Sequence, residues 1–191
     1  MTEKERLIKA LSGGKVDRKP VICPGGMMTM VSREVMARTG CVWPDANRDA
    51  GKMATLSMAM HDEAGVENLG IPFCMTVEAE AWGGEVEDGD EVTEPCIVAY
   101  PMQTVSDWRK LRKLDPSKDG RLPTILSCTR MLQGKRADTP VIGNLVGALS
   151  LASSLIDAVT LYKELLLDPA EVRGMLDFLT ENCIAYGEAL I

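Results

Sequence analysis

Three short apolar segments, each bounded by turn-forming residues, constrain the fold of this chain most strongly. They are Pro20–Pro24, Val66–Ile71 and Thr139–Gly143. Each is shorter than a typical helix and lacks the alternation of a half-exposed strand, so each is predicted to be a buried strand. A helical pattern follows each segment along the chain. Strands that alternate with helices indicate an α/β fold with a parallel sheet.

Capping residues and glycines delimit the predicted helices. Thr2 with Glu5 has the spacing of a capping box, and Asp168-Pro169-x-Glu171 supplies an N-cap, a proline at the first helical position and a glutamate at the third. The helices are expected to run from Thr2 to Gly13, from Ser32 to Gly40, from Asn47 or Asp49 to Gly65, from Ser106 to Pro116, over residues 121–136, and from Asp168 to the end of the chain.

Between the second and third strands the hydrophobic period changes to two. Residues 75–82 alternate apolar and polar side chains, which predicts a half-buried strand. Asp88-Gly89 is a favourable turn pair, and Cys96–Tyr100 is a plausible return strand. The sequence therefore predicts a β-hairpin inserted after the second buried strand.

Composition excludes several classes of function. The net charge of −7 argues against binding to nucleic acid, which usually requires a basic face. No apolar run is long enough to cross a membrane and no signal segment opens the chain, so a soluble, cytoplasmic protein is expected. The six cysteines are dispersed and His61 is the single histidine, so no local zinc site is predicted, and reduced thiols are favoured over disulfides. His61 itself is expected to be a surface or capping residue.

Several segments resemble a known family. They are Glu5-Arg-Leu-Ile-Lys-Ala-Leu11, Val16-Asp-Arg-Lys-Pro-Val-Ile-Cys-Pro-Gly-Gly-Met-Met28, Ile71-Pro-Phe-Cys-Met-Thr-Val-Glu-Ala-Glu80 and Pro140-Val-Ile-Gly-Asn-Leu-Val-Gly147. In this order they resemble the uroporphyrinogen decarboxylase-like barrels, in the branch of the methylcobamide:coenzyme M methyltransferases. The arginine-containing R-Q-A-G-R stretch of the decarboxylases is replaced here by Cys23-Pro-Gly-Gly-Met-Met28, which disfavours a tetrapyrrole decarboxylase.

The resemblance implies a partial (β/α) TIM-type barrel over residues 1–191, with about three strand–helix units plus the inserted hairpin. A closed eight-stranded barrel takes roughly 250 residues, so this length corresponds to an N-terminal half. The family holds zinc through a His-x-Cys pair and a later cysteine, and this chain has no counterparts of these ligands. Zinc and a methylcobamide are thus implied for the intact enzyme, whereas no metal ligand is predicted in this chain.

In such a barrel, functional groups lie at the carboxyl ends of the strands. This rule selects Cys23, Gly25 and Gly26 after the first strand as substrate- or corrinoid-binding residues, because two glycines let a ligand approach the backbone closely. A tight turn beside a small buried thiol explains the same residues. Phe73 and Cys74, after the second strand, are selected as binding residues in the same way.

Two further groups are candidates. On the predicted strand Glu78 and Glu80 would project to the same side, about 7 Å apart, as a carboxyl pair suited to proton transfer; a solvated face is the alternative. After the third strand, Gly143, Asn144 and Gly147 could present backbone N–H groups to an anion, although strand–helix packing also accounts for the glycines.

These expectations combine into one leading hypothesis. The chain is expected to be the N-terminal part of an enzyme that moves a methyl group from a methylcobamide on a corrinoid protein to a thiol or pterin acceptor such as coenzyme M, and to be inactive alone. A non-catalytic half-barrel that binds a corrinoid or a partner chain is the rival, and a decarboxylase remnant is the third. The open strand edge at Val141–Gly143 predicts pairing with the missing half or with a second copy, through residues 140–191.

Overall fold

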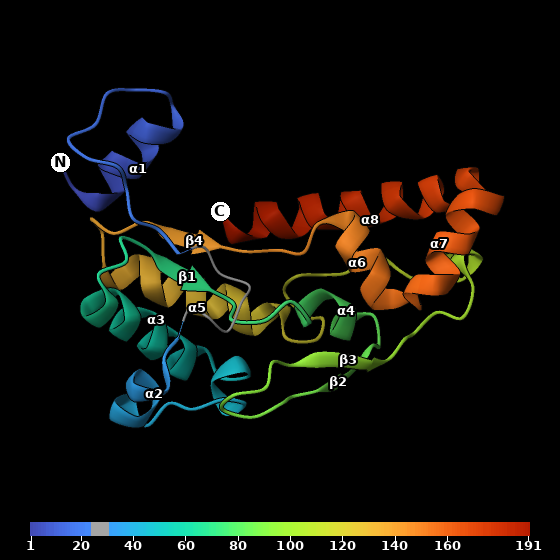
Figure 1. Cartoon of the computed structure of the whole chain (residues 1–191), viewed down its shortest axis with the longest axis horizontal. Coiled ribbons are helices and arrows are strands. Elements are labelled where there is room, and N and C mark those ends of the chain that lie inside the picture. Colours follow the sequence, from blue (N-terminus) through green and yellow to red (C-terminus); the bar gives the residue numbers. More distant parts are fainter. Residues whose placement is uncertain (24–30) are drawn as a thin grey trace. The chain divides into compact units, whose positions relative to one another are not determined.

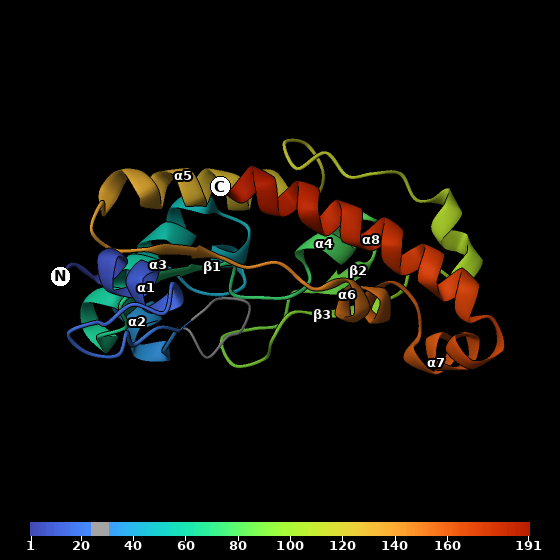
Figure 2. The same cartoon turned by 90° about the horizontal axis from the view of Figure 1, so that it is seen from above.

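The computed structural model describes residues 1–23 and 31–191, and these residues form two compact units (Figures 1 and 2). Unit 1 comprises Met1–Cys74, Asp90–Glu94 and Ser127–Asn144. Unit 2 comprises Met75–Gly89, Pro95–Leu126 and Leu145–Ile191. The α/β class expected from the sequence is confirmed, because helices surround short strands along the whole described chain.

The helices of unit 1 begin and end close to the predicted caps. They are α1 (Glu3–Leu11), α2 (Arg33–Thr39), η2 (Asp45–Asn47), α3 (Ala50–Ala64) and the main part of α5 (Leu122–Lys135). The Thr2–Glu5 capping box is present, and Ser32 caps α2. Asp49, not Asn47, caps α3 by accepting the Lys52 N–H at 2.8 Å. Left-handed glycines end α2 and α3, where a Cβ would be strained.

Two parallel strands form the sheet of unit 1. β1 (Leu69–Ile71) pairs with β4 (Val141–Gly143), so that Gly70 lies opposite Ile142. α3 packs against β1, where Ser57 donates a hydrogen bond to the Gly70 carbonyl at 3.2 Å. All three residues of β1 are buried, as predicted. β4 is only half-buried and Gly143 is exposed, so the prediction of a fully buried third strand is wrong.

The first predicted strand is also not confirmed. Residues 20–23 have no assigned secondary structure, and Pro24 lies outside the described residues. Val21 is 55% exposed and Ile22 is 40% exposed, so the predicted burial is wrong. The segment is nevertheless anchored to the residues before β1, because the Glu67 N–H donates to the Val21 carbonyl at 2.7 Å. Its apolar composition indicated a strand, but no described element covers these side chains.

Unit 2 combines a hairpin with a group of helices. Its elements are α4 (Val77–Ala81), β2 (Glu85–Glu87), β3 (Cys96–Ala99), η3 (Val105–Lys110), α6 (Ala148–Leu155), α7 (Ala158–Leu167) and α8 (Pro169–Leu190). α8 packs against α6, α7 and η3 (Figure 2). Its buried face carries Val172, Met175, Leu179 and Tyr186. Val172, Met175 and Leu179 join one apolar core with residues of α6.

The hairpin lies later in the chain than predicted. β2 pairs with β3 in antiparallel register, so the return strand at residues 96–100 is confirmed, but residues 75–82 do not form its partner. Residues 77–81 form α4 instead. Glutamate and alanine are strong helix formers and weak strand formers, and this preference outweighed the alternating pattern. The predicted helix from Ser106 is a short 3-10 helix, capped by Thr104.

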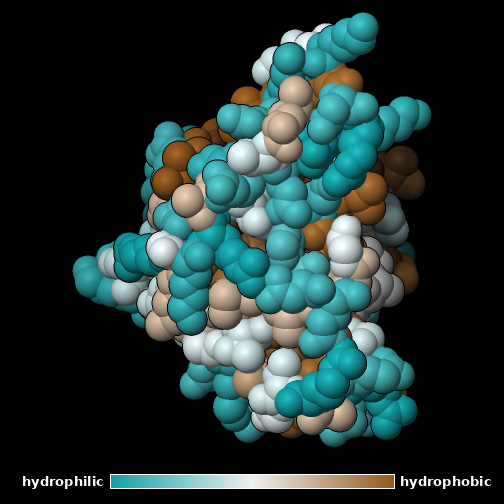
Figure 3. All heavy atoms as spheres, turned by 90° about the vertical axis from the view of Figure 1, so that its left-hand side faces the viewer, coloured by the Kyte–Doolittle hydropathy of each residue, from teal (hydrophilic) through white to brown (hydrophobic). Residues whose placement is uncertain are grey.

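The surface of unit 1 around α1 is mixed in character. Figure 3 shows hydrophobic spheres in separate places among hydrophilic ones on this side. Ile8 and Leu11 of α1 are 55% and 79% exposed. Within the described part of the chain, no helix has the length and the apolar composition needed to cross a membrane.

Candidate functional site

The predicted site residues divide between the two units. Cys23, Phe73, Cys74, Gly143 and Asn144 belong to unit 1, whereas Glu78, Glu80 and Gly147 belong to unit 2. Gly25 and Gly26 lie outside the described residues. Each group is therefore considered within its own unit.

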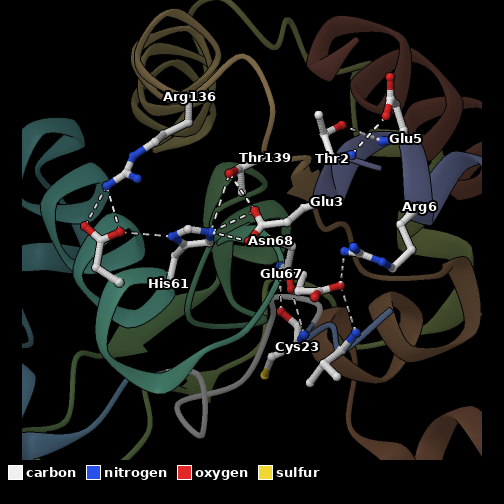
Figure 4. A network of polar contacts seen from close by, with 12 residues as sticks. Thr2, Glu3, Glu5, Arg6, Cys23, His61, Glu67, Asn68, Arg136 and Thr139 are labelled. Atoms are coloured by element: carbon white, nitrogen blue, oxygen red, sulfur yellow. Dashed lines mark hydrogen bonds and ion pairs between the residues drawn. The ribbon is translucent and has the colours of Figure 1, made fainter. Parts of the chain in front are cut away.

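Cys23 is held by the side chain of Asn68. The Asn68 Oδ1 accepts the Cys23 N–H at 2.7 Å, and the Asn68 Nδ2 donates to the Cys23 carbonyl at 2.9 Å (Figure 4). Asn68 is 1% exposed, while Cys23 is half-buried. The amide thus supplies both hydrogen bonds that a neighbouring strand would have supplied. Asn68 was not among the residues predicted from the sequence.

A buried ion pair holds the residues just before Cys23. Glu67 is 4% exposed; its Oε2 accepts from Arg6 Nη1 at 3.1 Å and from the Val21 N–H at 3.4 Å (Figure 4). Arg6 also binds Asp17. This hydrogen bond, with burial opposing it, holds the pKa of Asp17 well below its ordinary value. Through Glu67, helix α1 is therefore connected to the segment that leads to Cys23.

A cavity of about 190 Å³ adjoins Cys23 in unit 1. Its walls come from α3 and β1 and the residues around them: Cys23, Ser57, Met60, Ala64, Val66, Asn68, Gly70 and Phe73. The structure thereby brings together Cys23 and Phe73, two of the predicted binding residues. Phe73 is 1% exposed and its ring lies 6.2 Å from that of Trp43, so it is also part of the core. Cys74 is buried.

At the end of β4, Asn144 connects the two strands of the sheet. Its main-chain N–H and its Nδ2 both donate to the Ile71 carbonyl, each at 2.9 Å. The prediction placed Asn144 at a site for an anion, but this donor set is engaged with the end of β1. Gly143 is exposed beside it. Gly147 precedes the first residue of α6 and is exposed; a Cβ there would meet no atom within 4 Å, so packing does not require a glycine.

Glu78 and Glu80 do not form the predicted carboxyl pair. They lie on α4, where residues two positions apart project in nearly opposite directions. Glu78 is 5% exposed, and its Oε1 accepts the Val146 N–H at 2.7 Å. Glu80 forms an ion pair with Arg121, whose Nη2 also donates to the Thr76 hydroxyl at 2.7 Å. The geometry for proton exchange between the two carboxyls is therefore absent.

The environment of Glu78 is unusual for a carboxyl group. Burial raises its pKa, although the hydrogen bond from Val146 and the charge of Arg121 act in the opposite direction. The thiol of Cys183, on α8, donates to the Val146 carbonyl, with 3.3 Å between sulfur and oxygen. Burial and the nearby charge of Glu78 raise the pKa of this thiol. Two side chains thus hold both polar groups of one residue in the loop before α6.

His61 is more than a surface residue. Its Nε2 lies 2.8 Å from Glu3 Oε2 and its Nδ1 lies 3.0 Å from Asp62 Oδ1, and Asp62 also binds Arg136 (Figure 4). Thr139 donates to Glu3 at 2.7 Å, so the cluster joins α1, α3 and the residues before β4. Burial acts to lower the pKa of His61, but the hydrogen bonds to Asp62 and Glu3 outweigh it and raise that pKa above 6.5.

The described residues do not fit a zinc ion. Among residues 1–23 and 31–191, no three histidine, cysteine, aspartate or glutamate side chains converge as metal ligands. The two ring nitrogens of His61 face carboxylates on opposite sides. None of the six cysteines, all of which the structure describes, forms a disulfide. The donor set of this span therefore provides no metal centre.

The parallel pair of β1 and β4, with helices before and after each strand, places the chain in the α/β class, whose functional sites commonly lie at the carboxyl ends of the strands. Residues 2–191 match the family Uroporphyrinogen decarboxylase (URO-D), and the chain belongs to this family. The expected family resemblance is confirmed by this match.

Two relatives and one solved structure are similar to this chain over its whole length. Methylcobamide:CoM methyltransferases MtbA of Methanosarcina acetivorans and Methanosarcina mazei are 34% and 35% identical over 191 residues, which is all of this chain and 55% of each relative. A solved methyltransferase from Methanosarcina mazei has a TM-score of 0.90 and 29% identity, and covers 100% of this chain and 56% of its own. The chain thus spans about half the length of the relatives that it matches.

Proposed function

We propose that this chain is part of an enzyme that transfers a methyl group from a methylcobamide to a thiol acceptor. One observation carries the proposal: the chain aligns over its whole length with methylcobamide:CoM methyltransferases. A methylated-thiol–coenzyme M methyltransferase of Methanosarcina mazei, 28% identical over 190 residues, supports a thiol as the acceptor. The methyl donor is taken to be bound to a corrinoid protein.

The size of the cavity beside Cys23 limits the size of the ligand that this cavity can enclose. Pockets that enclose drug-sized ligands have volumes of roughly 300–1,000 Å³. At about 190 Å³, the cavity suits a short thiol and not a corrinoid ring. We therefore assign the segment at Cys23 and the residue Phe73 to the acceptor side of the site. We assign no role in proton transfer to the carboxyl groups of Glu78 and Glu80.

Zinc, which the family resemblance implies, is assigned to residues outside this span, since the described side chains do not fit it. The contribution of this chain is then to form one wall of the site and to limit the access of water to the acceptor. By itself the chain is expected to be inactive. Assembly with the remaining part of such an enzyme should restore the transfer.

Complementation tests this proposal. The chain is co-expressed with the part of the Methanosarcina acetivorans relative that lies outside the matched span, and the assembled protein is given methylcobalamin and coenzyme M. Loss of the methylcobalamin absorbance, with formation of methylated thiol, is the expected result, and each part alone serves as control. A stable assembly of both parts that leaves methylcobalamin unchanged, while the intact relative reacts, would contradict the proposal.

A further inference from the structure

The main chain changes its hydrogen-bonding side at Asn68. The N–H of Glu67 donates to the Val21 carbonyl at 2.7 Å, whereas the N–H of Leu69 donates to the Pro140 carbonyl at 2.9 Å. In a regular strand these two N–H groups, two residues apart, would point to the same neighbour. The change brings β1 into register with β4. As a result, the main chain around Asn68 no longer offers partners to the N–H and carbonyl groups of Cys23.

The side chain of Asn68 replaces those partners. A carboxamide carries one acceptor oxygen and one donor NH₂ group, the same pair that a peptide unit offers. Both meet the main chain of Cys23, at 2.7 and 2.9 Å (Figure 4). Neither leucine nor a charged aspartate, which are close to asparagine in size, can make both bonds. The geometry is therefore specific to the amide.

No other described side chain performs this task. Glu67 bonds to Val21, and it is shared with Arg6. Ser57 bonds to Gly70, in the strand itself. Because Asn68 is buried and makes both of its described side-chain hydrogen bonds to Cys23, its side chain is committed to this one residue.

We propose that Asn68 is a positioning residue, which fixes the main chain at Cys23 so that the acceptor side of the site keeps its shape. This inference rests on the proposed function for its catalytic consequence. Its structural part, that the amide holds Cys23, is independent of the reaction. Asn68 acts through Cys23 and touches no reacting atom.

Amide hydrogen exchange on the unmodified chain tests the structural part first. Cys23 lies in no helix or strand, and yet its N–H should exchange at least roughly tenfold more slowly than that of Ile22, for which the described residues offer no partner. Equal protection of the two amides, after correction for intrinsic rates, would overturn the proposal.

Two substitutions then separate positioning from general stability. Asn68→Leu should abolish the protection of Cys23. Ser57→Ala removes a buried hydrogen bond to the adjacent Gly70 and should leave the Cys23 amide as protected as before. Loss of Cys23 protection to the same degree in both variants would show a merely structural effect and contradict the proposal.

Asn68→Asp supplies a rescue that depends on pH. A protonated carboxyl can both accept and donate, and so restores the two bonds, whereas the carboxylate repels the Cys23 carbonyl. The protection of Cys23 relative to the unmodified chain at the same pH should therefore fall as pH rises from about 4 to about 7. A ratio that stays constant over this range would count against the amide as the positioning group.

The catalytic part uses the complemented enzyme. Asn68→Leu should lower kcat/KM for the thiol roughly tenfold or more relative to Thr39→Val, which removes a hydroxyl hydrogen bond within α2 and does not line the cavity, and the loss should arise mainly through KM. If the enzyme without substitutions transfers no methyl group, the proposed function fails, and the exchange results still decide the role of Asn68. If the enzyme is active and both variants have equal kcat/KM, the positioning role is wrong.

Discussion

Two loops of this molecule are held by side chains instead of by a neighbouring strand, and they differ in the chemistry that holds them. In unit 1, a neutral amide, Asn68, binds both main-chain groups of Cys23. In unit 2, Val146 is bound by two titratable groups, the carboxyl of Glu78 at its N–H and the thiol of Cys183 at its carbonyl. The hydrogen-bond distances in the two loops are similar, but the two loops should respond differently to pH.

This difference follows from the cost of burying a charge. The amide has no charge at any pH, so its two bonds are constant. Burial raises the pKa of Glu78, which means that the folded state favours the protonated form. The hydrogen bonds of the first loop are thus independent of pH, whereas the closed state of the second loop becomes less favourable when the buried Glu78 ionises.

The largest expected effect concerns the core behind the first loop. Phe73→Ala removes a ring that is 1% exposed and packed against Trp43, so unit 1 should lose about 3–5 kcal/mol of stability. Urea unfolding monitored by circular dichroism measures this loss. Leu166→Ala, at an 84% exposed position of α7, is the control and should change stability by less than about 0.5 kcal/mol. Similar midpoints for both variants would mean that Phe73 lines an open site and is not core.

The second prediction concerns Glu78 and the loop at Val146. In the window between the ordinary glutamate pKa of 4.5 and the raised pKa of Glu78, the folded state binds more protons than the unfolded state, so this carboxyl lowers stability as pH rises. Glu78→Gln keeps an oxygen acceptor for the Val146 N–H and removes the charge. The free energy of unfolding of the variant, relative to the unmodified chain, should therefore increase with pH.

The matched control for this experiment is Glu80→Gln. Glu80 lies on the same helix, but its charge is paired with that of Arg121, so removing this charge should not favour the variant at higher pH. Unfolding in urea at a series of pH values reports both variants. Parallel curves for Glu78→Gln and the unmodified chain would refute the buried-charge explanation.

The third prediction also concerns a stabilisation that falls as pH rises, but it belongs to unit 1 and to a group that is charged when protonated. The pKa of His61 is raised, so the stabilisation from its bonds to Asp62 and Glu3 is complete below the unfolded pKa, about 6.5, and is lost as pH rises through the folded value. His61→Gln should remove this pH dependence and destabilise the chain more at acidic than at alkaline pH. An NMR titration of the ring that gives a pKa at or below 6.5 would contradict it.

The smallest effect is expected for the thiol of the second loop. An S–H group is a weak donor, so Cys183→Ala should cost about 1 kcal/mol or less, even though it removes the bond to the Val146 carbonyl. Cys183→Ser, which retains a hydroxyl donor, is the control. A loss of several kcal/mol in the alanine variant alone would show that the thiol, and not Glu78, chiefly holds this loop.

Local signals in the sequence predicted the helices well and the strands less well. The caps at Thr2, Ser32, Asp49 and Asp168 fixed helix positions because they act on adjacent residues. The prediction of a strand at residues 75–82 was wrong because alternation of alanine and glutamate is compatible with both a strand and a helix. The prediction of a buried strand at residues 20–23 was wrong because apolar character indicates burial without showing which element would cover these side chains.

The candidate site was predicted in part. The rule that functional groups follow parallel strands selected Phe73 and Asn144, which do lie after β1 and β4. It also selected Cys23, which follows no described strand and is bonded to Asn68, directly before β1. Asn68 was missed because its role depends on a partner 45 residues away and on a change of hydrogen-bonding side that no local pattern reveals. A polar pair, Glu67-Asn68, directly before an apolar strand was the one available signal.

A single hydrogen-exchange series on the unmodified chain tests the contrast between the two loops most directly. The protection of the Cys23 and Val146 amides, corrected for intrinsic exchange, is measured from about pH 5 to about pH 7. Opening of the second loop releases Glu78 to water, with Arg121 and Cys183 as its charged and titratable neighbours. Protection of Val146 should therefore fall as pH rises, while that of Cys23 stays constant. Equal pH dependence at both amides, or a rise at Val146, would contradict the account.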